Sequence, residues 1–429
     1  MTSRGNSNEC YVYITLPGET DFVTAGKFVL TTDRHGVPTG KFVYGRSYVA
    51  RRNAVPIDPL ELKLGTKTYE TTLLKGVFGA LRDASPDYWG RRVIEKRSGK
   101  VELGEMDYLL YSPDDRAGAL GFGLNQKPPA PRRKFNRTMD LKRLQELADA
   151  IIADEDLPQD PDAEQARDLM QGGTSMGGAR PKVVVEDDES LWIAKFNQSD
   201  DKWNHARVEQ AMLVLARACK IQCAESKVVP IGDRDVLMVK RFDRDKTEAG
   251  YLRARMISGL TLLRAEDSHP HRDRWSYVVL AEELRRVCSN PKDDAAELFR
   301  RMCFNALISN IDDHPRNHAF IAKHKDWNLS PAYDLTPSTP ISLERRDLAM
   351  NCGDMGRYAH ANNLLSQSER FYLMHEDAAA TVAAMEEHIA GTWYETARRE
   401  GVSEQDCEKI KSAFVYPGFR LTLEATTRA

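Results

Sequence analysis

The chain has 429 residues, of which 41% are hydrophobic and 29% charged, so it can bury more than one core and is not a disordered chain. Its 61 basic and 64 acidic residues leave a net charge of −3, which excludes strong non-specific attraction to nucleic acid or to membrane surfaces. We expect a cytoplasmic protein without a membrane span, because the sequence has no long apolar run and no secretory-type N-terminal segment. The seven cysteines are scattered, and we expect reduced thiols.

The first part of the chain, residues 1–130, is predicted to be rich in β-strands. Short apolar runs separated by Gly or Asp predict strands at 11–15, 27–30 and 41–44. Ser85 followed by Pro86 is typical of a helix start, with Ser85 as the N-cap. The basic, proline-rich segment 127–134 has the composition of a linker and ends this part.

The second part, residues 131–245, begins with a helix predicted from about Asp140 and continues into a glycine-rich segment at 172–182. Backbone N–H groups of such a segment can approach phosphates closely, because glycine has no side chain. The residues that would lie there are Ser175, Gly177 and Gly178. The segment matches neither common phosphate-loop pattern, so a flexible hairpin is an equal interpretation.

Two strands, at 183–185 and 191–196, come after the glycine-rich segment and place Lys195 within apolar sequence. A lysine in a buried strand needs a reason, and kinases use such a lysine on the ATP phosphates. The next element is an amphipathic helix at 205–219 that carries Glu209. Glu209 could pair with the strand lysine, or it could be solvated, which is the commoner fate of a helix glutamate.

A hairpin of strands at 228–231 and 236–243 closes the second part. Its exit strand carries Lys240 and Phe242 and would supply the edge that contacts adenine. The third part, residues 246–429, has a helical pattern, with long helices predicted at 293–309 and 378–399.

The segment from Asn310 to Asn317, with the sequence N-I-D-D-H-P-R-N, comes directly after the first of these helices. Asp312 and Asn317 have four residues between them, as in a kinase catalytic loop, where Asp is the base and Asn holds Mg²⁺. A further aspartate, Asp334, lies in apolar sequence 17 residues after Asn317, where a second carboxylate ligand of the metal is expected. A simple turn remains an alternative, because Asp, Asn and Pro all favour turns.

The same residues allow a zinc site as a rival, with Asp312, Asp313, His314 and His318 as ligands. Pro315 prevents a continuous helix between the two histidines, and no Cys pair lies nearby. We expect His314 and His318 to brace the loop by hydrogen bonds instead.

In their order along the chain, the GGARPK, WIAKF, VKRFDR, NIDDHPRN and PAYDLTP segments resemble the HipA family of serine/threonine kinase toxins of type II toxin–antitoxin systems. The resemblance is detailed from about 170 to 350. It implies an α+β, bilobal protein-kinase-like fold, with a β-rich N-terminal subdomain, a mixed nucleotide lobe and a mostly helical C-lobe.

The resemblance also implies roles for residues and the cofactors ATP and Mg²⁺. Asp312 would be the base, and the metal ligands would be Asn317 and Asp334. Lys195 would contact the ATP phosphates, and Ser175 matches an autophosphorylated serine of the family. Backbone groups from Lys240 to Phe242 would frame adenine. Lys240 departs from the Glu often found at its position, but backbone recognition tolerates this change.

The partners implied by the resemblance are a HipB-like helix-turn-helix antitoxin, operator DNA bound mainly through that antitoxin, and a protein substrate such as an aminoacyl-tRNA synthetase. Basic patches at Arg91–Arg92 and at 132–134 could touch DNA phosphates, or could be ordinary solvated charge. Two alternatives stay open: a non-toxic kinase of the same fold acting on a small molecule or another protein, and a catalytically dead co-repressor subunit.

Overall fold

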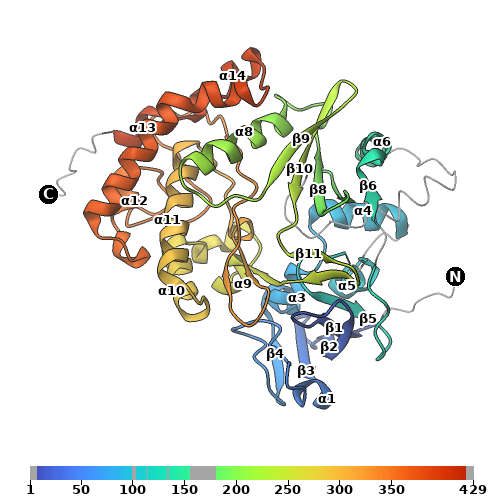
Figure 1. The fold of residues 1–429 in the computed structure, drawn as a ribbon. Helices are drawn as coiled ribbons and strands as arrows, with labels where there is room; N and C mark the ends of the chain where they lie inside the picture. Colours follow the sequence, from blue (N-terminus) through green and yellow to red (C-terminus); the bar gives the residue numbers. More distant parts are fainter. Residues whose placement is uncertain (1–6, 99–102, 114, 133–134, 155–179, 422–429) are drawn as a thin grey trace. The chain divides into compact units, whose positions relative to one another are not determined.

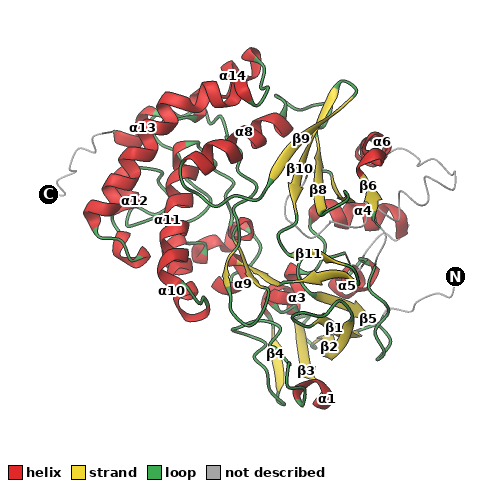
Figure 2. Cartoon of the chain, in the orientation of Figure 1, coloured by secondary structure: helices red, strands yellow, loops and turns green. Residues whose placement is uncertain are grey.

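A computed structural model describes residues 7–98, 103–113, 115–132, 135–154 and 180–421, whose path is drawn in Figure 1. The chain divides into two compact units. Unit 1 comprises residues 1–199, 225–271 and 318–330, and unit 2 comprises residues 200–224, 272–317 and 331–429. Unit 1 holds the β-sheets and unit 2 the longest helices, so the expected α+β class with a β-rich N-terminal region is confirmed (Figure 2). The division into three parts stays a prediction.

The N-terminal sheet of unit 1 has five antiparallel strands in the order β4-β3-β2-β1-β5. The strands are β1 (Glu9–Thr15), β2 (Phe22–Thr32), β3 (Pro38–Tyr44), β4 (Thr68–Thr71) and β5 (Leu120–Gly123). The three predicted strands in this region are confirmed. Short helices lie between these strands in sequence: α1 (Arg46–Val49), α2 (Leu73–Gly76), α3 (Gly79–Asp83), α4 (Tyr88–Ser98) and α5 (Glu105–Tyr111).

The start of α4 corrects the predicted N-cap. The helix begins at Tyr88, and the Oδ1 atom of Asp87 accepts a 2.9 Å hydrogen bond from the backbone N–H of Gly90. Ser85 is buried, and its hydroxyl has no hydrogen-bond partner in the described structure. Aspartate is as good an N-cap as serine, and here it is the residue that precedes the first helical turn.

The second sheet of unit 1 has the order β6-β7-β8-β10-β9, with β6 parallel to β7 and the other pairs antiparallel. Its strands are β6 (Asn136–Arg137), β7 (Lys182–Glu186), β8 (Leu191–Phe196), β9 (Ser226–Ile231) and β10 (Arg234–Lys240). Helix α6 (Leu141–Ile152) covers one face with its leucines and isoleucines, which share a buried cluster with Trp192, Phe196 and Met238. This confirms the helix expected from Asp140.

Unit 1 also contains short strands that the sequence pattern missed. They are β11 (Arg244–Thr247), β12 (Gly250–Arg253), β13 (Arg255–Ser258), β14 (Ala319–Ala322) and β15 (Asn328–Leu329), with helix α9 (Gly259–Leu263) between β13 and β14 in sequence. The sequence pattern was expected to turn helical beyond about residue 250, and strands β12 to β15 depart from that expectation. Strands of two to four residues are too short to show a period in the sequence.

Unit 2 is mostly helical. Its α-helices are α8 (His205–Ala218), α10 (Tyr277–Val287), α11 (Pro291–Leu307), α12 (Ala361–Leu365), α13 (His375–Arg399) and α14 (Glu404–Ile410). Helix α13 packs against α8 and α11, and α10 packs against α11. The inward face predicted for α8 is confirmed, because Val208, Met212 and Leu215 are fully buried.

Short 3-10 helices complete the chain at η1 (Thr138–Asp140), η2 (His269–Arg274), η3 (Pro315–Asn317), η4 (Ser368–Phe371), η5 (Lys411–Ala413) and η6 (Pro417–Arg420). Among the described residues, no helix is both long and apolar enough to cross a membrane. All seven cysteines are free thiols, as expected.

Candidate active site

The most informative local structure is the loop after α11, which we call the Asp312 loop (Asn310–Asn317). Helix α11 begins with Pro291 and has acidic residues in its first turn, a sequence suited to a helix N-terminus. It ends at Leu307, and Ser309 adopts a φ of 53°, which turns the chain out of the helix. Asp312 is exposed at the far end of this turn.

The second aspartate of the loop has a structural role. Asp313 is 1% exposed, and its Oδ2 atom accepts hydrogen bonds from the hydroxyl of Tyr277 and, at 2.8 Å, from Nδ2 of Asn305. Burial, followed by the charge of Asp313, raises the pKa of Tyr277 well above its usual value, so the tyrosine remains a donor. Of two adjacent aspartates, one therefore anchors the loop to α10 and α11, and the other is left exposed.

Asn317 closes the loop with an unsatisfied oxygen. Its backbone N–H bonds to the carbonyl of His314 at 2.9 Å, and its Nδ2 lies 3.5 Å from the carbonyl of Asp312. The residue is 5% exposed, and within the described part of the chain its buried Oδ1 has no hydrogen-bond partner. An orphaned buried acceptor costs free energy, and a cation would satisfy it. Amide and carboxylate oxygens are the ligands that Mg²⁺ prefers, so the residue fits the metal role.

The segment that carries Asp334 lies against the same loop. The Tyr333 hydroxyl donates a 2.8 Å hydrogen bond to the carbonyl of Arg316, which directly precedes Asn317. Ala332 pairs in parallel with Cys223 on its other side. Asp334 has a φ of 60°, a conformation that residues other than glycine adopt rarely and that is often found at functional sites. The structure thus brings Asp312, Asn317 and the Asp334 segment together in unit 2.

The two histidines were expected to brace the loop by hydrogen bonds. His314 lies edge-on to Trp275, with 6.5 Å between ring centroids, and no described residue forms a hydrogen bond with its buried Nδ1. Bracing of the loop by the two histidines stays a prediction, while Asp313 supplies hydrogen bonds that hold the loop. The zinc alternative has no ligand set in the described part of the chain, where no group of three His, Cys, Asp or Glu side chains could hold a metal.

The predicted phosphate lysine lies in the second sheet of unit 1. Lys195 is partly buried on β8, where its neighbours across the sheet are Lys182 on β7 and Leu237 on β10. Directly opposite residues share a face of a sheet, so both lysines lie on the same face. Lys182 is 1% exposed and forms a 2.7 Å ion pair with Asp87. The sequence signal for this second lysine was its place at the head of an apolar run.

The predicted adenine-contacting strand ends earlier than expected, at Lys240 rather than at residue 243. The Lys240 N–H bonds to the carbonyl of Glu225 at 2.8 Å, and its ammonium pairs with the Glu225 carboxylate at 2.9 Å, which raises the pKa of Lys240. The Arg241 N–H bonds to the Leu191 carbonyl at 2.9 Å. Phe242 comes next and is partly exposed.

The remaining predicted site residues are those of the glycine-rich segment and Glu209. Ser175, Gly177 and Gly178 lie outside the described residues. Glu209 is 4% exposed on α8, so its interpretation as a solvated side chain was wrong. It belongs to unit 2 and Lys195 to unit 1, and their pairing stays a prediction.

The basic pair Arg91–Arg92 is used inside unit 1. Arg91 forms two hydrogen bonds with the carboxylate of Glu105, at 3.0 and 2.6 Å, and Arg92 donates to the carbonyls of Ile151 and Ile152 at the end of α6. The interpretation of this pair as solvated charge is therefore wrong too, because both side chains hold neighbouring elements together.

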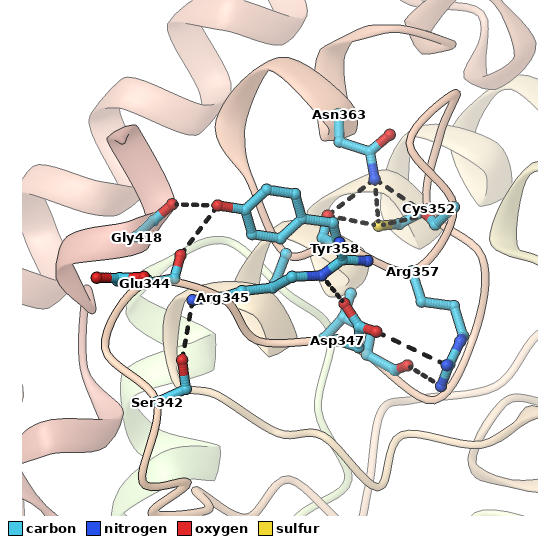
Figure 3. A network of polar contacts seen from close by, with 12 residues as sticks. Ser342, Glu344, Arg345, Asp347, Cys352, Arg357, Tyr358, Asn363 and Gly418 are labelled. Carbon is cyan, nitrogen blue, oxygen red and sulfur yellow. Dashed lines mark hydrogen bonds and ion pairs between the residues drawn. The ribbon is translucent and has the colours of Figure 1, made fainter. Parts of the chain in front are cut away.

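A polar network lies beyond the Asp334 segment in unit 2 and was not anticipated (Figure 3). The Tyr358 hydroxyl lies 3.0 Å from the carbonyl of Glu344 and 3.2 Å from that of Gly418. Asp347 accepts from Arg345 at 3.0 Å and pairs with Arg357 at 3.7 Å. These contacts join the chain after Asp334 to the C-terminal segment, and no sequence pattern links such distant residues.

Two models of protein-family domains match this chain. The model of the HipA-like C-terminal domain matches residues 174–393, and that of the HipA N-terminal domain matches residues 23–123. A Haemophilus influenzae protein named as a candidate kinase is 24% identical over 188 residues, which cover 40% of this chain. The chain spans about half of that relative, 54% of its length.

A solved structure extends the likeness to nearly the whole fold. The Shewanella oneidensis toxin–antitoxin protein HipA, solved with HipB and operator DNA, superposes with a TM-score of 0.68 at 17% identity. The superposition covers 96% of this chain and 100% of that one. With a domain model that matches more than half of its residues, the chain belongs to the HipA family.

Proposed function

We propose that this protein is an ATP-dependent serine/threonine protein kinase. The observation that carries the proposal is the buried Oδ1 of Asn317, which lacks a hydrogen-bond partner among the described residues and lies in one loop with the exposed Asp312. Phosphoryl transfer needs an oriented acceptor and cations on the phosphates, and little covalent help from the protein. The family membership and the name of the Haemophilus relative support the same reaction class.

In the proposed reaction, the Asp312 carboxylate takes the proton of the acceptor hydroxyl. The hydroxyl oxygen bonds to the γ-phosphorus of ATP while the bond to the ADP oxygen breaks. Asn317 and Asp334 would hold Mg²⁺, and the ion would neutralise charge on the phosphate oxygens. Lys195 would contact the phosphates, and backbone groups from Lys240 to Phe242 would contact adenine. Asp313, through Asn305 and Tyr277, keeps the loop in shape.

The test compares Asp312→Asn with the wild-type protein in single-turnover transfer from radiolabelled ATP. Transfer should fall by more than about a hundredfold, the usual worth of a general base, while ATP affinity persists. Asp245→Asn is the matched control, because Asp245 is also an exposed aspartate, and among the described residues its ion-pair partner is Lys323. Transfer by Asp312→Asn within about tenfold of wild type, or about 1.4 kcal/mol in barrier, would remove Asp312 as the base.

We further propose that the kinase is the toxin of a HipBA-like module and has a HipB-like antitoxin as its partner. The support is the similarity to a HipA that was solved with HipB and operator DNA. A translation component such as an aminoacyl-tRNA synthetase is the proposed target. Induced expression should arrest growth, and phosphoproteomics of wild-type against Asp312→Asn cells should name the substrate. Growth arrest by Asp312→Asn would favour the catalytically dead co-repressor. Phosphorylation of a cellular target by the wild-type protein without growth arrest would favour the non-toxic kinase.

A further inference from the structure

A fully buried charge network surrounds the strand exit after β10. Arg241 is enclosed in unit 1, with its side chain 0% exposed. Its Nε and Nη2 donate to the two carboxylate oxygens of Asp243, at 3.0 and 2.9 Å. Its Nη1 donates to Oδ1 of Asp115 at 2.5 Å, and Nη2 also reaches the carbonyl of Arg116 at 2.7 Å. Four of its hydrogen bonds thus end on two buried carboxylates and one carbonyl.

The network also fixes the segment 115–118, which precedes β5 of the N-terminal sheet. The backbone N–H of Gly118 donates to Oδ2 of Asp243 at 2.9 Å. Arg244 donates to the same carboxylate at 2.7 Å and to the Arg116 carbonyl at 2.6 Å. The segment 115–118 is therefore tied to residues 241–244 at several points, although about 125 residues separate them in sequence.

Burial of this many charges needs a reason. A buried ion pair adds little net stability compared with apolar residues of the same volume, because both ions lose their hydration. A buried ion pair does fix the geometry of its residues, because separating the two ions would leave a buried charge without compensation, at a high cost in free energy. Here the fixed stretch contains Phe242, which is partly exposed and lies between two wholly buried residues. The backbone of residues 240–243 is held by side chains as well as by its own hydrogen bonds to Glu225 and Leu191.

We propose that Asp115, Arg241 and Asp243 are positioning residues for the nucleotide, which make the segment 115–118 a supporting part of the adenine-contacting backbone at 240–242. The inference rests on the proposed kinase function. The segment 115–118 would then influence ATP binding without contacting ATP itself. Asp243 stays ionised in this setting, because Arg241 and Arg244 hold its pKa far below the usual range against the effect of burial.

The test uses the full-length protein and the isosteric variant Asp115→Asn, which removes one charge that faces Arg241. The Michaelis constant for ATP should rise by about tenfold, the worth of one charge-assisted hydrogen bond, while kcat stays within about twofold. Discrimination against GTP should weaken as well, because the adenine-contacting backbone is less fixed. Arg241→Lys keeps the charge but loses the planar contact of the guanidinium with two oxygens. It should also raise the Michaelis constant for ATP while kcat stays nearly unchanged.

Glu105→Gln is the matched control, because it removes a carboxylate that makes two hydrogen bonds with Arg91 in the same unit without touching residues 240–244. It should lower the unfolding temperature without changing the Michaelis constant. If Asp115→Asn and Arg241→Lys change the unfolding temperature and leave the Michaelis constant at the value of this control, the network is only structural and the inference fails.

A measurement on the wild-type protein covers the case in which the variants do not fold. Added ATP should slow hydrogen exchange of backbone amides in 115–118 and 240–244, but not in α5, which holds Glu105. ATP that binds without protecting 115–118 overturns the inference and leaves the kinase proposal intact. A wild-type protein that binds no ATP overturns both.

Discussion

The Nη1 atom of Arg346 donates a 2.5 Å hydrogen bond to the hydroxyl oxygen of Ser309, the residue that turns the chain from α11 into the Asp312 loop. The same nitrogen reaches the carbonyl of Ser412 at 2.9 Å, and the Ser309 hydroxyl donates to the carbonyl of Ala413 at 2.6 Å. One guanidinium therefore joins the chain after Asp334, the start of the loop and the C-terminal segment.

The first prediction concerns this guanidinium. Arg346 is 3% exposed and its resolved hydrogen bonds end on neutral oxygens, so Arg346→Met removes a buried charge together with its contacts. We expect kcat to fall by at least about tenfold with little change in ATP affinity, because the substitution removes support from the Asp312 loop and not from the strands proposed to contact ATP. Steady-state kinetics beside isothermal titration with ATP measure the two effects. Equal loss of both would contradict the assignment.

The second prediction separates metal binding from stability at Asn317. Asn317→Ala removes an orphaned acceptor, so it should cost the unfolding free energy less than about 1 kcal/mol while the Mg²⁺ needed for half-maximal activity rises. Asn305→Ala is the control, because it removes the hydrogen bond to Asp313 and should cost about 1–3 kcal/mol by leaving that carboxylate short of a donor. Urea unfolding without metal gives the first quantity, and an activity titration with Mg²⁺ gives the second. An unchanged Mg²⁺ requirement in Asn317→Ala would remove the residue from the metal site.

The third prediction is a pH dependence of stability in unit 1. Burial, followed by the nearby charge of Asp58, raises the pKa of Glu61 from 4.5 to about 7. A carboxyl whose folded pKa lies above its unfolded pKa binds more protons in the folded state, so its stabilising contribution is complete below pH 4.5 and is lost as the pH rises to about 7. The loss amounts to a few kcal/mol, on the order of 1.4 kcal/mol for each unit of pKa.

Glu61→Gln tests this dependence, because glutamine stays neutral and can still accept the bond from the Gly79 N–H. The difference in unfolding free energy between variant and wild type should grow in favour of the variant from about pH 5 to about pH 8. Denaturant unfolding at several pH values measures it. A difference that stays constant over this range would show that Glu61 does not titrate there.

The fourth prediction concerns Ser175, in the glycine-rich segment outside the described residues. Phosphorylation there would add about 1.5–2 negative charges to a loop that is proposed to lie near the ATP phosphates. We expect purified protein incubated with ATP and Mg²⁺ to become phosphorylated at Ser175 and to bind ATP at least about tenfold more weakly. Ser175→Ala should keep its affinity under the same treatment. Mass spectrometry that finds no phosphate at Ser175 contradicts the prediction.

The sequence predicted the elements whose pattern is long enough to repeat. Helices α8, α11 and α13 show several turns of apolar spacing, and β8 and β10 are apolar runs bounded by turns. The strands from β11 to β15 were missed because two to four residues give no period. The cap of α4 was misplaced because Ser85 and Asp87 are chemically equivalent candidates two residues apart.

For the candidate site, the sequence supplied residue types and spacing but no burial. Asp312 and Asp313 are the same residue type side by side, and only the contacts of Asp313 with Tyr277 and Asn305 distinguish them. The Arg241 network was missed because its partner Asp115 lies 126 positions away and no local pattern records such a contact. Arg346 was missed for the same reason.

The hydrogen bonds of Ser309 also bear on the order in which the Asp312 loop and its supporting residues are synthesised. The carbonyl of Ala413 that receives the Ser309 hydroxyl is synthesised 104 residues after it. During translation, the nascent polypeptide therefore carries Asp312 well before it carries the residues that hold the surrounding loop. An incomplete product that stops before Ala413 therefore contains Asp312 but lacks the hydrogen bond from Ser309 to Ala413 that supports the loop.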